Sequence, residues 1–172
     1  MIQKCSYLQV LEVFFREPTM IHFIREIGKK INLAPTSVKN NINELLKAKL
    51  ITEKKSKPFD GFMANRENDQ FIFYKRLYNF YTLDSLKKEI VEILYPKAVV
   101  VFGSYCLGED IETSDIDILI LSKVNEDLTL NKFEKSLGRK INVIVVDNSN
   151  KLDKNIQRKV RNGFILYGGI NE

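Results

Sequence analysis

Two aspartates separated by one residue, Asp115 and Asp117, interrupt an otherwise apolar segment of this 172-residue chain. In an extended strand, side chains two residues apart project from the same face, with Cα atoms about 6.6 Å apart. Burying isolated carboxylates is unfavourable, and a divalent cation is one of the few partners that offsets two of them. Mg²⁺ prefers oxygen ligands and keeps positions for water and substrate phosphates. The pair predicts a Mg²⁺ site, and a solvated turn is the alternative.

A glycine and a serine, Gly103 and Ser104, stand ten residues before this pair. They follow the apolar run 98–102, which predicts a buried strand that ends where a helix begins. Gly103 lets the backbone approach a phosphate closely, and Ser104 offers a hydroxyl and a backbone N–H at the start of the helix. A phosphate-binding turn at a fixed distance from two carboxylates indicates nucleotidyl transfer.

Three short segments carry a resemblance to a known family. Residues 101–104 (Val-Phe-Gly-Ser), 108–109 (Gly-Glu) and 114–117 (Ser-Asp-Ile-Asp) are similar to the signature of the DNA polymerase β-like nucleotidyltransferase superfamily, in its minimal stand-alone form. The resemblance covers about residues 83–170. It implies a mixed sheet flanked by helices, with Gly103 and Ser104 binding the nucleotide phosphates. It also implies that Asp115 and Asp117 hold two Mg²⁺ ions while an acceptor hydroxyl attacks the α-phosphate of an NTP, expected to be ATP.

One position departs from the pattern of that superfamily, which has a third carboxylate on a later strand. The strand is predicted at residues 140–146, and the matching position holds Asn142. An amide can ligate a cation but cannot accept a proton, and loss of a general base lowers a rate by about 10²- to 10⁴-fold. Asp147 is no substitute, because an offset of five residues turns it to the other face and moves it about 16 Å away.

Positive charge is concentrated in the amino-terminal part of the chain. Residues 1–66 contain 12 Lys or Arg and 6 Asp or Glu (+6), whereas residues 67–172 contain 15 and 16 (−1), which together give the net charge of +5. A basic half in an otherwise neutral protein predicts nucleic-acid binding there, with an ordinary solvated surface as the alternative.

The same part of the chain predicts three helices, over residues 5–16, 21–31 and 35–48, and then a β-hairpin from residues 50–53 and 62–64. This order resembles a winged helix-turn-helix domain, in which the third helix enters the major groove of double-stranded DNA. The expected DNA contacts are Ser37, Lys39, Asn40 and Asn41 on that helix and Lys54, Lys55 and Lys57 on the hairpin. A module that docks a protein is the alternative.

The predicted fold class is therefore α+β. A winged helix-turn-helix domain (1–68) is followed by a helical connector (69–95) and an α/β nucleotidyltransferase domain with a mixed sheet (96–172). The connector is expected to be helical throughout, with a cap at Asp84 and with aromatic residues that pack rather than bind bases. A homodimer seam along it is an alternative.

Other features exclude some classes. No run of 18 apolar residues is present, so we expect no membrane span and a cytoplasmic protein. The two cysteines, Cys5 and Cys106, form no metal-ligand spacing with the single histidine and are expected to be reduced. His22 is expected to be an ordinary helix residue.

The predicted function is transfer of a nucleoside monophosphate from an NTP to a hydroxyl acceptor. The resemblance further implies an antitoxin that modifies a partner toxin of the HEPN ribonuclease type, with the DNA-binding domain regulating the operon. Two alternatives remain open. One is a transcription regulator whose transferase domain has lost turnover through Asn142, and the other is a non-catalytic antitoxin that masks its toxin.

Overall fold

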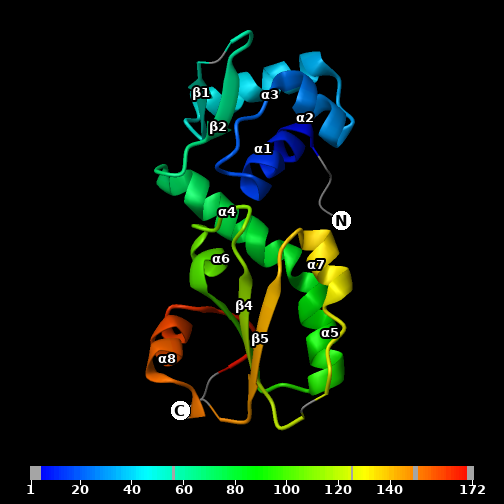
Figure 1. Ribbon diagram of the computed structural model, residues 1–172, viewed down its shortest axis with the longest axis vertical. Coiled ribbons are helices and arrows are strands. Elements are labelled where there is room, and N and C mark those ends of the chain that lie inside the picture. Colours follow the sequence, from blue (N-terminus) through cyan, green and yellow to red (C-terminus); the bar gives the residue numbers. More distant parts are fainter. Residues whose placement is uncertain (1–4, 56, 125, 149–150, 170–172) are drawn as a thin grey trace. The chain divides into compact units, whose positions relative to one another are not determined.

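The computed structural model describes residues 5–55, 57–124, 126–148 and 151–169. It divides into two compact units, Met1–Lys75 and Arg76–Glu172, and the boundary falls within helix α4 (Asp69–Thr82). Each unit has its own sheet (Figure 1). Among the described residues, no helix combines the length and the apolar character that a membrane span requires.

Three helices and a hairpin form the first unit. The helices are α1 (Ser6–Arg16), α2 (Ile24–Ile31) and α3 (Pro35–Lys47), and the antiparallel strands β1 (Ile51–Lys54) and β2 (Gly61–Ala64) form the hairpin. The elements follow the predicted order, although α2 begins three residues later than expected. Their inward faces are completely or almost completely buried at Val10, Phe14, Ile27, Val38, Ile42, Leu45 and Leu50.

The turn between α2 and α3 has the expected chemistry. Asn32 ends α2 in the left-handed conformation, with a φ of 53°, which asparagine tolerates better than most residues. Pro35 begins α3, where its fixed φ suits the helix and its missing N–H leaves no donor unsatisfied.

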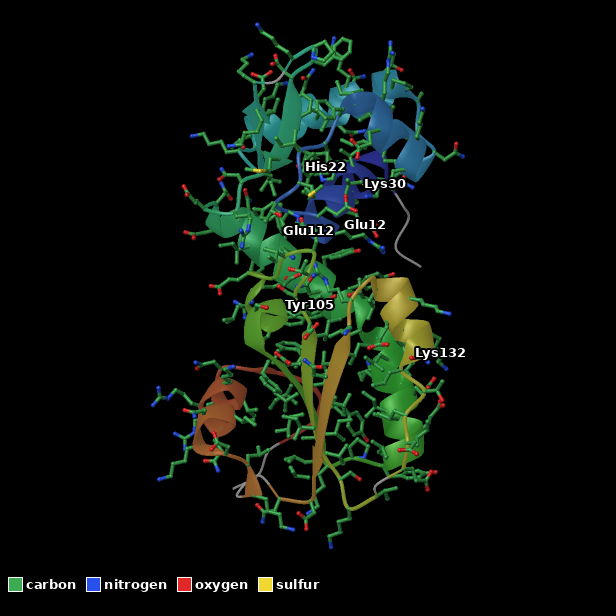
Figure 2. The ribbon with its side chains drawn as sticks, viewed as in Figure 1. Glu12, His22, Lys30, Tyr105, Glu112 and Lys132 are labelled. Carbon is green, nitrogen blue, oxygen red and sulfur yellow. The ribbon has the colours of Figure 1, made fainter. Side chains whose placement is uncertain are left out.

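His22 does not lie in a helix, so that prediction was wrong (Figure 2). Its backbone forms an isolated antiparallel bridge with Phe62 of β2, with both N···O distances at 2.8 Å. The imidazole is 1% exposed, packs edge-on against Phe14 with ring centroids 5.2 Å apart, and contacts the Glu17 carbonyl through Nε2 at 3.1 Å. The segment before α2 is therefore extended because it pairs with the hairpin, a long-range contact that helical spacing cannot reveal.

A four-stranded mixed sheet forms the centre of the second unit. Its strands are β3 (Ala98–Phe102), β4 (Ile116–Leu121), β5 (Ile141–Val146) and β6 (Phe164–Gly168), in the order β5-β4-β3-β6. β3 is antiparallel to both of its neighbours, whereas β4 and β5 are parallel. The predicted mixed sheet is confirmed.

Different helices cover the two faces of this sheet (Figure 1). One face packs against α5 (Asp84–Leu94), α6 (Gly103–Leu107) and α7 (Asn131–Leu137), and its core includes Val99, Val101, Ile116, Ile118 and Ile120. The opposite face, here called the α8 face, packs against α8 (Lys154–Arg161), and its core contains Ala98, Val100, Phe102, Leu119, Leu121, Leu152 and Val160. Side chains alternate along a strand, so Asp117 belongs to the α8 face with Leu119 and Leu121.

The predicted connector corresponds to α4 and α5, which are separated at Leu83. Asp84 does not cap α5 as expected. It is the first residue of that helix, and its carboxylate pairs instead with Lys87 at 2.6 Å and Lys88 at 2.8 Å. Of the α4 aromatics, Phe71 is 1% exposed and Phe80 stacks on Phe164 with centroids 4.0 Å apart, as packing groups should. Phe73 and Tyr81 are 54% and 62% exposed, so the packing prediction was wrong for these two residues.

Candidate active site

Strand pairing brings the three predicted polar positions together. Asp117 of β4 lies opposite Asn142 of β5 in parallel register, and Asp115 immediately precedes β4. The Asn142 side-chain nitrogen donates to Asp115 Oδ2 and to Asp117 Oδ1, each at 3.2 Å. Both carboxylates therefore converge on one point at an end of the sheet.

Gly103 lies beside this point. Phe102, the last residue of β3, pairs with Asp117, and Gly103 then turns the chain into α6 with a φ of +74°. A Cβ at Gly103 would lie 2.7 Å from Asp117 Oδ2, which is shorter than real contacts allow. The glycine thus suits the backbone conformation, and a larger residue would displace the carboxylate. Ser104, the second residue of α6, is half-buried.

The charges of this site suit a cation. Asp115 and Asn142 are exposed and Asp117 is half-buried, so the carboxylates are accessible from solvent. The Asn142 amino group occupies the position between them that a cation would favour, and turning the amide would present its oxygen there instead. Among the described residues, no three His, Cys, Asp or Glu side chains form a metal-binding group. The two aspartates and the Asn142 oxygen therefore fit a divalent cation with one anionic ligand fewer than a three-carboxylate site.

A buried ion pair, which no sequence pattern indicated, fixes the loop that leads to Asp115. Asp110 is 0% exposed, and its Oδ2 lies 2.7 Å from Arg139 Nη2. The same guanidinium donates to the carbonyls of Ile111 and Ser114, within that loop. Asn79 of α4 donates to Asp110 Oδ1 at 2.8 Å. Asp110, Arg139 and Asn79 are thus positioning residues for the carboxylates.

Asp147 and Cys106 lie outside this cluster of contacts. Asp147 follows β5 and pairs with Lys151 at 2.9 Å, and this hydrogen bond lowers the pKa of its carboxyl. Cys106 is buried in α6, and burial raises the pKa of its thiol, which makes it a poor nucleophile.

The residues predicted to contact DNA differ in their solvent exposure and in the partners that they already have. Lys39 and Asn40 are exposed on α3, whereas Ser37 and Asn41 are half-buried and joined by a hydrogen bond of 2.9 Å from the Asn41 amide to the Ser37 carbonyl. On the hairpin, Lys54 is half-buried, Lys55 and Lys57 are exposed, and Lys55 pairs with Asp60 at 3.0 Å and Glu53 at 3.3 Å.

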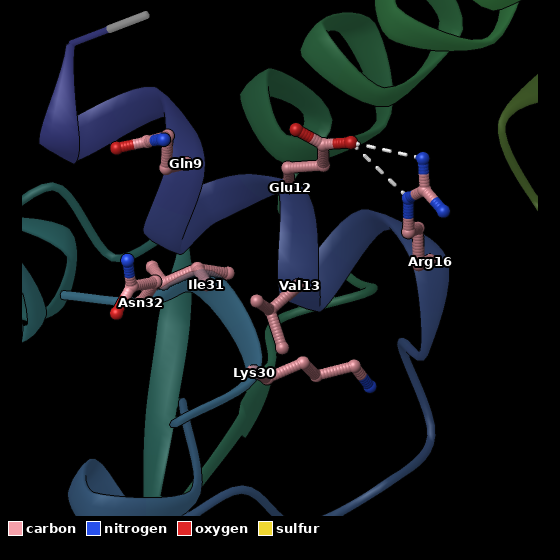
Figure 3. Close-up of a pocket in the computed structure, with 7 residues that line it drawn as sticks. All are labelled: Gln9, Glu12, Val13, Arg16, Lys30, Ile31 and Asn32. Atoms are coloured by element: carbon pink, nitrogen blue, oxygen red, sulfur yellow. Dashed lines mark hydrogen bonds and ion pairs between the residues drawn. The ribbon is translucent and has the colours of Figure 1, made fainter. Parts of the chain in front are cut away.

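A cavity of about 410 Å³ lies between α1 and α2 (Figure 3). Its charged groups all form ion pairs, because Glu12 pairs with Arg16 at 3.1 Å and Lys30 pairs with Glu17, which lies outside the lining. The residues that line it are Gln9, Glu12, Val13, Arg16, Lys30, Ile31 and Asn32. None of the predicted DNA contacts is among them.

The mixed sheet, the convergent carboxylates and the adjacent glycine turn fit a domain that transfers nucleotidyl groups. Residues 83–167 match the family model of the nucleotidyltransferase domain. A protein of Methanocaldococcus jannaschii, whose name describes it as a protein adenylyltransferase, is 53% identical over 34 residues, which cover 20% of this chain and 40% of that relative. The chain thus spans less than half the length of this curated relative. Both matches support the nucleotidyltransferase superfamily and nucleotidyl transfer as the general chemistry.

Proposed function

We propose that the second unit transfers a nucleoside monophosphate from an NTP, with ATP as the expected donor, to a hydroxyl of an acceptor. The observation that carries this proposal is the convergence of Asp115, Asp117 and Asn142 beside the Gly103 turn. The family match and the adenylyltransferase relative support the same chemistry, and the relative's name favours a protein as the acceptor.

Each residue has a defined task in this proposal. Asp115 and Asp117 hold Mg²⁺, which would neutralise the triphosphate and align the attacking and leaving oxygens. Gly103 leaves room for the Asp117 carboxylate, and Ser104 presents a hydroxyl and an N–H to the phosphates. Asn142 cannot accept the proton of the attacking hydroxyl, so that proton passes to solvent or to the substrate. We therefore expect slow turnover.

The test is transfer of label from an α-labelled NTP in the presence of Mg²⁺, with and without the product of the adjacent gene. A HEPN-type toxin encoded there is the proposed acceptor. We expect label on that protein with the wild-type chain and none with Asp115→Asn combined with Asp117→Asn. Equal labelling by the wild type and the double variant would contradict the assignment of the site.

A second candidate function is that of a non-catalytic regulator or antitoxin, and the Asn142 side chain favours it. Its amide occupies the position between the carboxylates that a cation would need. Asn142→Asp restores a proton acceptor and a third negative charge, so a lapsed enzyme would gain turnover of about 10²- to 10⁴-fold. If wild-type labelling is absent and Asn142→Asp labels the acceptor, the second candidate is the correct one.

For the first unit, we infer a winged helix-turn-helix domain that binds double-stranded DNA. Its three helices and hairpin occur in the order of that fold, and residues 1–66 carry a net charge of +6, from 12 basic and 6 acidic residues. Lys39 and Asn40 are exposed on α3, where a recognition helix would contact the major groove. A homodimer would match a two-fold DNA site.

A further inference from the structure

Lys140 lies beside the convergent carboxylates, at the start of β5. It is the residue before that strand, and its carbonyl oxygen accepts a hydrogen bond of 2.9 Å from the Ile116 backbone N–H. This bond continues the parallel pairing of β4 and β5 by one residue, because Ile116 pairs with Ile141. Lys140 is therefore level with Asp115, one strand spacing of about 4.8 Å away.

The alternation of side chains along β5 gives the direction of Lys140. Ile141 is 6% exposed and belongs to the core on the α5 side of the sheet. Its neighbours Lys140 and Asn142 therefore project from the α8 face, which also bears Asp117, and both are exposed. The contact of the Asn142 amide with Asp117 at 3.2 Å shows that side chains at one level of β4 and β5 meet on this face.

The ammonium group of Lys140 carries a charge that no carboxylate neutralises. Within the part of the chain that the structure describes, Lys140 forms no ion pair. The preceding residue, Arg139, is held by Asp110 and by two loop carbonyls. The flexible four-carbon stem of lysine spans the distance between adjacent strands, so the Lys140 ammonium reaches the side of the Asp115 carboxylate.

The charges of this site differ from those of a two-metal centre. Asp115 and Asp117 contribute two negative charges and Lys140 one positive charge, so the net charge is −1. With a carboxylate in place of Asn142 and no lysine, the net charge would be −3. Two divalent cations about 4 Å apart repel each other strongly and need several anionic ligands. Among the described residues, no third His, Cys, Asp or Glu joins the pair in a metal-binding group.

Lys140 and Gly103 lie on opposite sides of the carboxylates. In the strand order β5-β4-β3-β6, Gly103 follows β3 and Lys140 precedes β5, with β4 between them. The proposed phosphate contacts at Gly103 and Ser104 put the leaving pyrophosphate on the β3 side. In an in-line displacement the attacking and leaving oxygens lie on opposite sides of the phosphorus, so the acceptor hydroxyl approaches from the β5 side, where Lys140 lies.

We propose that this centre holds a single divalent cation, and that Lys140 supplies the positive charge that a second cation provides in a two-metal site. The inference rests on the proposed nucleotidyl transfer and departs from the two Mg²⁺ ions that the superfamily resemblance implies. Asp115 and Asp117 bind the one cation, and the Lys140 ammonium stabilises negative charge on the attacking oxygen. That oxygen forms a bond to the α-phosphorus, the bond to pyrophosphate breaks, and the hydroxyl proton passes to solvent or to the substrate.

The first measurement is the EPR spectrum of Mn²⁺, which suits the same oxygen ligands as Mg²⁺, bound to the full chain. An ATP analogue with a methylene group between its α- and β-phosphorus atoms prevents turnover. We expect the spectrum of an isolated Mn²⁺ ion, whereas two ions about 4 Å apart would give a spin-coupled spectrum. Lys140→Gln combined with Asn142→Asp should produce the coupled spectrum, because the site then has three carboxylates and no ammonium. A coupled spectrum from the wild type overturns the inference.

The second measurement is the affinity for Mn²⁺ without nucleotide, by calorimetry at low salt. Lys140→Gln should raise this affinity about 5- to 30-fold, because it removes the repulsion between a unit charge and a divalent cation about 8 Å apart. Lys123→Gln is the matched control. Lys123 is exposed beyond the other end of β4, at least about 20 Å from Asp115, and its loss should leave the affinity unchanged. Equal affinities of Lys140→Gln and the wild type overturn the role of Lys140.

The outcomes separate this inference from the function on which it rests. If the wild type shows a coupled pair of Mn²⁺ ions and Asp115→Asn with Asp117→Asn abolishes their binding, the single-cation centre is overturned and the nucleotidyltransferase site stands. If the wild type binds no Mn²⁺ with or without nucleotide, both proposals fail. Thermal unfolding of each variant shows that the fold is retained.

Discussion

At Gly103, the lack of a side chain allows β3 to end directly against the Asp117 carboxylate. Gly103 meets two separate requirements. Its φ is +74°, and a Cβ on this residue would lie only 2.7 Å from Asp117 Oδ2. The sequence predicted a close approach of the backbone at this glycine, but to a phosphate, and it did not predict the positive φ of the first requirement. The second depends on the pairing of β3 with β4, which brings Asp117 next to the turn and is not local in the chain.

Gly103→Ala should therefore abolish binding of ATP with Mg²⁺ as well as strain the backbone. A left-handed alanine costs about 1–2 kcal/mol, and the added Cβ displaces the Asp117 carboxylate. Gly138→Ala is a matched control, because Gly138 has a φ of +68° with nothing within 4 Å of its Cβ position. Both variants should lose similar stability in urea, but only Gly103→Ala should lose nucleotide affinity in calorimetry. Equal nucleotide affinity in the two variants would contradict the steric argument.

At the scale of elements, the loop between α6 and β4 is held by residues from two other places in the chain. Asp110 belongs to the loop, Asn79 to α4, and Arg139 follows α7. In the sequence, nothing distinguishes these three residues from charged or amide residues on the protein surface. Only the assembled fold shows that they are buried together, which explains why strand alternation predicted the placement of Asp115 and Asp117 but not of the ion pair that positions them.

Arg139→Ala should destabilise the second unit strongly, because it leaves the Asp110 carboxylate buried without its cation. Removing one partner of a buried pair costs about 3–5 kcal/mol. Lys151→Ala, which breaks the exposed pair with Asp147, is the control and should have a much smaller effect. The measurements are urea unfolding and hydrogen exchange of residues 109–115, where exchange should accelerate in Arg139→Ala. A loss of stability no larger than that of the control would show that the pair does not hold the loop.

At the scale of the whole molecule, sequence patterns predicted the mixed sheet and the order of helices and hairpin in the first unit. Hydrophobic periodicity predicted α3, where one face is buried, and a nearly continuous apolar run predicted β4, which is buried on both faces. Periodicity failed at His22, where the chain is extended by pairing with Phe62 across 40 residues of sequence. It also could not show which surface lysines are already paired, and this distinction matters for the proposed role of the first unit.

The charge of the first unit predicts DNA binding that weakens steeply with salt. Each phosphate neutralised contributes a slope of about −0.9 to log affinity against log salt. Lys39 and Lys54 form no ion pair within the described residues, so each alanine substitution should weaken binding at low salt and reduce that slope by about 1. Lys55 is the internal control, because Asp60 and Glu53 already neutralise its ammonium group, and Lys55→Ala should have the smaller effect.

The measurement is fluorescence anisotropy with duplex DNA over a range of salt concentrations. If Lys39→Ala and Lys54→Ala leave both affinity and slope unchanged, α3 and the hairpin do not contact the phosphate backbone, and a protein-docking role for this unit becomes the better explanation of its charge.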